Sequence, residues 1–127
     1  MELKFSFDTI IFYVQNVDRL KSFYKKTFNL EIIEEYQSIW ALLDAGTCKI
    51  GFHKIGDKYL NENKGVFKFD NNTKIVFEID NDINEVRAHF IDQNVVMREI
   101  KTFDNYDYWL CDGEDPEGNV FQLKQKK

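Results

Sequence analysis

The sequence predicts an α+β fold made of two modules, each with one strand, one helix and three further strands. The modules are expected to form a curved mixed sheet with the helices on its outer face. Short β-branched and aromatic runs separated by turn residues predict the strands, and two segments with apolar residues at helical spacing predict the helices. The 127 residues, 43% of them hydrophobic, with one proline, fit a single domain over residues 1–127.

The first module is expected at about residues 6–54. After a strand at residues 8–14, Leu20 and Tyr24 mark one face of a helix that begins near Val17. Asn16 or Asp18 can cap its start, and the helix should end near Asn29, because asparagine tolerates left-handed backbone. Three more strands are expected at residues 30–36, 39–43 and 48–53.

The second module is expected at about residues 73–124, after a polar connection at about residues 55–72 that is either a link or a functional lid. Its helix face is marked by Ile83, Val86 and Phe90. Its strands are expected at residues 74–79, 95–100, 106–111 and 120–123, with a solvated acidic turn at residues 112–119.

The order of elements in the second module repeats that of the first. Val14 corresponds to Ile79 at the end of the first strand, and Leu20 corresponds to Val86 in the helix. These two spacings agree to within one residue, which indicates an internal repeat rather than a chance likeness of two helices.

The net charge and the cysteine content limit the classes of partner and site that the chain is expected to have. The net charge is −5 and no long basic run offsets it, which argues against a nucleic-acid or membrane partner and slightly favours a cationic ligand. Cys48 and Cys111 lie far apart, so a zinc or redox motif is not expected. The chain shows no signal region and no apolar run long enough for a membrane span, so a cytoplasmic location is expected.

Two segments carry a family resemblance. Residues 12–20 (FYVQNVDRL), followed by Ser22-Phe23-Tyr24, and residues 115–123 (DPEGNVFQL) resemble the opening and the close of vicinal-oxygen-chelate proteins. This superfamily includes glyoxalase I, extradiol dioxygenases, and fosfomycin and bleomycin resistance proteins. The resemblance covers about residues 6–124 and implies their fold, which does not define one activity. Pro116 has a fixed φ and Gly118 can adopt a positive φ, as a tight turn before the last strand requires. The second motif is therefore expected to have a structural role.

The resemblance also implies where a metal ion would bind in the enzymes of the superfamily. The four ligand positions correspond to Thr9, Gly51, Lys74 and Gln122. Glycine has no side-chain donor, a protonated lysine repels a dication, and threonine and glutamine are weak ligands. We therefore expect no metal ion and no other cofactor.

A ligand-binding cleft is expected between the remaining side chains of the same strand faces. Strand alternation places Tyr13 with Thr9 and Glu78 with Lys74. Glu78 would attract a cation, and the aromatic rings would stack on an aromatic ligand. The candidate ligand-binding residues are Tyr13, Trp40, His53, Glu78, Trp109 and Gln122.

The preferred hypothesis is metal-independent binding of a small aromatic molecule, with a cation favoured, in the cleft of a homodimer. This would resemble drug sequestration by bleomycin resistance proteins, and the dimer would cover exposed sheet edges. The alternative is a lyase or isomerase of glyoxalase or dioxygenase type with non-standard or absent metal ligands, with His53 or Glu78 as base. A third is a domain that acts through protein contacts, with its cleft filled by Tyr13, Trp40 and Trp109.

Overall fold

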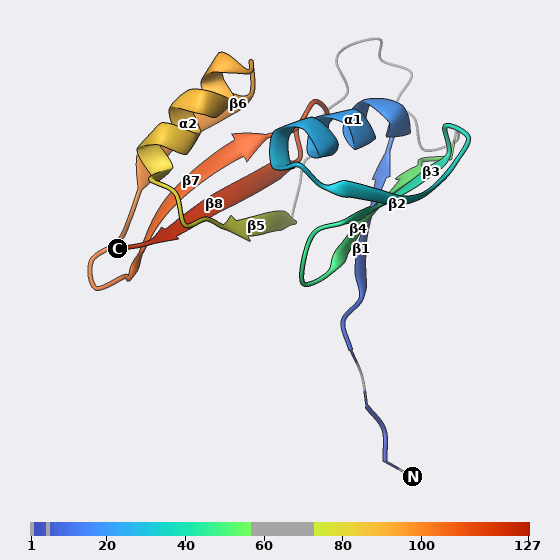
Figure 1. Cartoon of the computed structure of the whole chain (residues 1–127), viewed down its shortest axis with the longest axis horizontal. Helices are drawn as coiled ribbons and strands as arrows, with labels where there is room; N and C mark the ends of the chain where they lie inside the picture. Colours follow the sequence, from blue (N-terminus) through green and yellow to red (C-terminus); the bar gives the residue numbers. More distant parts are fainter. Residues whose placement is uncertain (1, 5, 57–72) are drawn as a thin grey trace. The chain divides into compact units, whose positions relative to one another are not determined.

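The computed structural model describes residues 2–4, 6–56 and 73–127. Most of the predicted connection or lid therefore lies outside the described residues. The chain forms two compact units, Met1–Gly65 and Val66–Lys127, each holding one module. Each module has one strand, one helix and three strands, which confirms the predicted α+β class and the internal repeat (Figure 1).

The sheet of module one has the strand order β1-β4-β3-β2. β1 runs parallel to β4, and the other pairs are antiparallel. Helix α1 packs on β3 and β4 (Figure 1). The elements are β1 (Thr9–Val14), α1 (Val17–Phe28), β2 (Glu31–Tyr36), β3 (Trp40–Asp44) and β4 (Lys49–Lys54).

Helix α1 begins and ends at the predicted residues. The Asn16 side chain accepts a hydrogen bond from the backbone N–H of Arg19 at 3.0 Å. Asn29 ends the helix with a φ of 55°, in the left-handed region. The buried face of the helix packs on the sheet through Tyr24, whose ring centroid lies 5.1 Å from that of Phe52.

Module two repeats this topology with the strand order β5-β8-β7-β6. β5 runs parallel to β8, and helix α2 packs on β6, β7 and β8 (Figure 1). Asp82 caps α2 by accepting from the backbone N–H groups of Asn84 and Glu85. The elements are β5 (Lys74–Glu78), α2 (Ile83–Asp92), β6 (Val96–Lys101), β7 (Tyr108–Glu114) and β8 (Val120–Lys126).

The turn between β7 and β8 is shorter and more buried than predicted. Strand β7 continues through Asp112 to Glu114, so the prediction of a turn from residue 112 was wrong. The Asp115 carboxylate accepts from the backbone N–H groups of Glu117 and Asn119, both at 2.9 Å. Because the Asp115, Glu117 and Asn119 residues are buried, the expectation of a solvated acidic turn was also wrong.

Strand alternation gives each sheet one face covered by its helix and one helix-free face. In module one Phe52 faces α1, while the exposed Ile11 and Tyr13 lie on the helix-free face. In module two Phe121 packs against Phe90 of α2, with ring centroids 6.3 Å apart. The strand phase predicted for β1 and β5 agrees with the structure. Among the described residues no helix is long and apolar enough to cross a membrane.

Candidate functional site

Three aromatic residues meet on the helix-free face of module one. Tyr13 of β1 and Trp40 of β3 are the register partners of His53 of β4. The ring centroid of His53 lies 5.6 Å from that of Tyr13 and 6.2 Å from that of Trp40. The structure therefore brings together three of the six predicted binding residues, which we call the aromatic cluster.

Gly51 provides the room in which the Trp40 ring lies. A Cβ atom on residue 51 would stand 2.5 Å from Cη2 of Trp40 and 3.3 Å from Cγ1 of Ile11. The indole is also held at its edge, because Nε1 of Trp40 donates to Oε1 of Glu34 at 3.0 Å. At this position of the sheet an indole ring thus takes the space that a side chain on residue 51 would need.

The imidazole of His53 has one nitrogen engaged by the backbone. Nδ1 lies 2.8 Å from the carbonyl oxygen of Lys54. A carbonyl oxygen can only accept, so this hydrogen bond requires the proton on Nδ1. In the neutral ring, Nε2 then keeps a lone pair that can accept a proton or a hydrogen bond.

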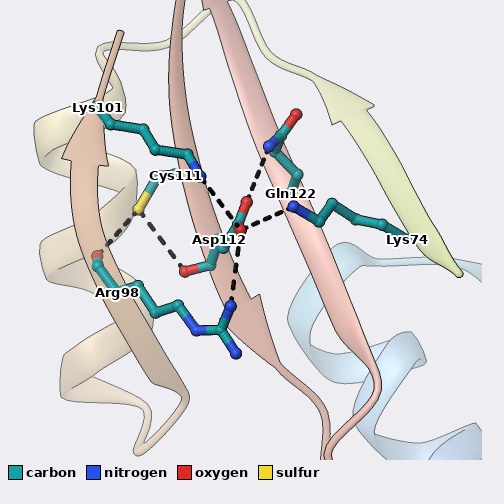
Figure 2. Close-up of polar contacts among 6 residues, drawn as sticks. All are labelled: Lys74, Arg98, Lys101, Cys111, Asp112 and Gln122. Atoms are coloured by element: carbon teal, nitrogen blue, oxygen red, sulfur yellow. Dashed lines mark hydrogen bonds and ion pairs between the residues drawn. The ribbon is translucent and has the colours of Figure 1, made fainter. Parts of the chain in front are cut away.

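A charged cluster occupies the helix-free face of module two, centred on Asp112. Its carboxylate accepts hydrogen bonds from Nζ of Lys74 and from Nε2 of Gln122, each at 2.9 Å. NH1 of Arg98 and Nζ of Lys101 each lie 3.7 Å from the carboxylate (Figure 2). We call these five residues, drawn from β5, β6, β7 and β8, the Asp112 cluster.

The electrostatics of the Asp112 cluster favour the ionised carboxylate. Burial on its own would raise the pKa of Asp112, since the side chain is only 4% exposed. Hydrogen bonds from Lys74 and Gln122, with the charges of Lys74 and Lys101, outweigh burial and lower the pKa below its ordinary value. Asp112 is therefore a buried anion at neutral pH.

The neighbouring Cys111 belongs to the core rather than to the charged face. Its thiol donates to the backbone carbonyl of Arg98 at 3.4 Å (Figure 2). The same carbonyl accepts from Nε of Arg87 at 2.8 Å. Burial raises the pKa of the Cys111 thiol. A buried, protonated thiol is a poor nucleophile and a poor metal ligand.

The four residues at the metal-ligand positions do not fit a divalent ion. The hydroxyl of Thr9 donates to Asp8 at 2.6 Å, and Gly51 lies beneath Trp40. Lys74 and Gln122 are both bound to Asp112. Within residues 2–4, 6–56 and 73–127 no three His, Cys, Asp or Glu side chains are grouped to hold a metal ion.

The remaining predicted residues are divided between the two faces of module two. Glu78 lies on the same helix-free face as Gln122, and its register partner is Lys124. Trp109 pairs with Gln125, whose side chain accepts from the backbone N–H of Ile83 at the start of α2. Alternation therefore places Trp109 on the helix-covered side, away from Glu78 and Gln122.

Sequence reasoning missed three members of the Asp112 cluster. Asp112 was assigned to a turn, Arg98 was assigned to a strand without a functional role, and Lys101 lay just beyond the end of that predicted strand. The apolar run of residues 108–111 identifies strand β7, but it does not show that the strand continues through Asp112 to Glu114. Arg98 could not be placed, because the pairing of β6 with β7 shifts register between Met97 and Ile100.

The two modules have the vicinal-oxygen-chelate fold, as the two sequence motifs predicted. A lactoylglutathione lyase from Agrobacterium tumefaciens is similar, with a TM-score of 0.73 and 14% identity over 98% of this chain and 96% of that one. The fosfomycin resistance protein FosX from Listeria monocytogenes has a TM-score of 0.70 and 18% identity, over 100% of this chain and 96% of that one.

A third similar structure is TnmS3, an antibiotic binding protein from Streptomyces sp. CB03234. Its TM-score is 0.71, with 15% identity over 100% of this chain and 99% of that one. A scan against protein-family models finds no match, and neither does a search of curated proteins. Identities this low show a shared fold and leave the activity open.

Proposed function

We propose that the protein binds a small aromatic molecule on its aromatic cluster without a metal ion. The observation that carries the proposal is the grouping of Tyr13, Trp40 and His53 on the helix-free face of module one. Tyr13 is 59% exposed, so its ring is accessible to a planar ligand. Each favourable ring contact contributes about 0.5–1.5 kcal/mol beyond the burial of apolar area.

The metal-independent character of the proposal follows from the donor set. Lys74 and Gln122 would have to leave Asp112 before either could coordinate a metal ion, and an ammonium group repels a dication. Elemental analysis of the purified protein is expected to find no stoichiometric zinc, nickel, iron or manganese. About one bound metal per chain, removable together with an activity, would overturn this part of the proposal.

The biological role that fits such binding is sequestration of an aromatic antibiotic, as in a bleomycin-resistance-like protein. The similarity to an antibiotic binding protein supports the role through the fold. Binding is proposed to take place in a homodimer, because β1 and β5 are edge strands of their sheets and edges favour pairing. A monomeric mass at micromolar concentration in light scattering would exclude the dimer.

The contacts of Glu78 do not favour a cationic ligand. Glu78 was expected to attract a cation, but its register partner is Lys124, and the Asp112 cluster adds further positive charge to the same face. The aromatic cluster is therefore proposed to bind the aromatic ring of the ligand and not a charged group.

Tryptophan fluorescence tests the proposal, because Trp40 and Trp109 lie in different modules. Acridine, a planar aromatic that absorbs tryptophan emission, serves as the probe. In Trp109→Phe, where Trp40 is the remaining tryptophan, we expect saturable quenching, weakened about tenfold by Tyr13→Ala. Linear, non-saturating quenching, or equal quenching of Trp109 in Trp40→Phe, would contradict binding at the aromatic cluster.

An enzymatic role is the second candidate, and the tautomer of His53 favours it. With Nδ1 donating to Lys54, Nε2 can act as a base on the helix-free face. Lactoylglutathione, the compound named in the lyase of similar fold, is a suitable test compound. Conversion abolished by His53→Gln would favour the enzyme, and no turnover with or without added metal would favour binding alone.

A further inference from the structure

We propose that the Asp112 cluster of module two is a binding site for a small oxyanion, such as a carboxylate or phosphate group. The residues of this cluster belong to module two, whereas those of the aromatic cluster belong to module one, and the inference goes beyond the proposed function. It rests on the charge balance, the exposure and the hydrogen-bond geometry of Lys74, Arg98 and Lys101.

The cluster contains more positive than negative charge. Lys74, Arg98 and Lys101 all lie within 4 Å of one carboxylate, that of Asp112. Glu114 is the next carboxylate along the same strand face, and even with its charge included a positive excess remains. Holding like charges this close is unfavourable unless an anion offsets them.

The charged side chains of the Asp112 cluster differ in exposure in a way that would let an anion approach from solvent. The Asp112 side chain is 4% exposed, whereas those of Lys74, Arg98 and Lys101 are 39%, 53% and 47% exposed. The carboxylate thus lies at the base and the cations surround it (Figure 2). An incoming anion would meet the cationic groups before it could be repelled at short range by Asp112.

The hydrogen-bond geometry leaves donors available for a second anion. Lys74 donates to Asp112 at 2.9 Å, but Arg98 and Lys101 stand at 3.7 Å, which is ion-pair distance and too long for a hydrogen bond. Guanidinium and ammonium groups carry several N–H donors each. Among the described residues Arg98 makes no other side-chain ion pair, so its fork can receive two oxygen atoms.

The donor types define the class of ligand. A guanidinium beside two ammonium groups suits the paired oxygens of a carboxylate, phosphate, phosphonate or sulfonate. Gln122 adds polarity: its amide nitrogen donates to Asp112, so the amide oxygen is directed elsewhere (Figure 2). A cation is disfavoured at this site, because the three nearest charged side chains around Asp112 are positive.

An NMR titration tests the site with inorganic phosphate and with acetate as separate probes. The ¹⁵N-labelled chain is titrated with each probe at constant ionic strength, balanced with sodium chloride. We expect saturable shifts at the amides of β6 and β7 near Asp112 and at the Nε–H of Arg98. Arg98→Gln and Lys101→Gln are each expected to weaken binding about tenfold, the loss of one charge-assisted hydrogen bond.

Lys126→Gln is the matched control, because it removes one charge from β8 on the same face, roughly 13 Å along the strand from Gln122. This variant should bind the probes as the parent chain does. Saturable binding of either probe, lost with Arg98 and Lys101 but not with Lys126, supports the site. Shifts that grow linearly with both probes, or an equal loss in Lys126→Gln, would overturn it. Dispersed amide spectra show that each variant is folded.

Discussion

Replacing the buried carboxylate of Asp112 with an amide tests the electrostatics of module two. Asp112→Asn keeps the shape of the side chain but leaves Lys74, Arg98 and Lys101 without their shared anion. Breaking a fully buried ion pair costs about 3–5 kcal/mol. The cations here are partly exposed and can return to water, so we expect a loss of about 2–3 kcal/mol in the free energy of unfolding.

The pH dependence of this loss follows from the lowered pKa of Asp112. A carboxyl group with a lower pKa in the folded state stabilises the fold above its unfolded pKa, and this contribution disappears as pH falls through the folded pKa. The difference between parent and Asp112→Asn should therefore be constant near neutral pH. It should shrink below about pH 4, where protonated Asp112 comes to resemble asparagine.

Urea denaturation followed by circular dichroism measures both effects. Asp104→Asn is the control, because Asp104 lies in an exposed turn and its replacement should change stability by about 0.5 kcal/mol or less. A loss for Asp112→Asn no larger than that of the control would refute the role of the ion pairs. A difference that persists unchanged at acidic pH would refute the assignment of the effect to the ionised carboxylate.

Two further substitutions test the packing of the site and the buried turn. Gly51→Ala should lower the free energy of unfolding, measured by urea denaturation, by about 1–3 kcal/mol, because the new Cβ meets Trp40. This loss should be smaller in a Trp40→Ala background. An equal loss in both backgrounds would argue against the contact. Asp115→Ala should lower the free energy of unfolding by about 3 kcal/mol, because it removes the carboxylate that accepts from the Glu117 and Asn119 backbone N–H groups. A change below about 0.5 kcal/mol would show that the capped turn contributes little to stability.

Local features of the fold could be predicted because they depend on few neighbours. Asn16 and Asn29 cap the two ends of α1 through their own side-chain and backbone preferences. Asn29 was the predicted end, and Asn16 was one of two predicted caps, the other being Asp18. The strand phase that exposes Tyr13 followed from the family resemblance, which places Thr9 on the cleft face. Alternation then puts Tyr13 on that face and Val14 in the core, as the structure shows.

The Asp112 cluster could not be predicted because Asp112-Gly113 has the composition of a turn. In the structure Gly113 lies within the strand, where a Cβ would collide with the Phe121 ring and stand 2.6 Å from Sδ of Met97. The glycine therefore serves close packing beneath the helix rather than chain reversal. This reason is tertiary, and no local pattern in the sequence expresses it.

The two modules also show why the metal-ligand positions cannot be considered one at a time. In module one, Gly51 is compatible with the Trp40 ring only because it has no side chain, so a carboxylate there would require the indole to move. In module two, Lys74 and Gln122 both satisfy Asp112, so replacing either with a metal ligand would leave a buried carboxylate with fewer donors. Each position is tied to a second residue that has its own role in packing or charge balance. Replacing any one of Gly51, Lys74 or Gln122 with a metal ligand would therefore require a compensating change at Trp40 or Asp112.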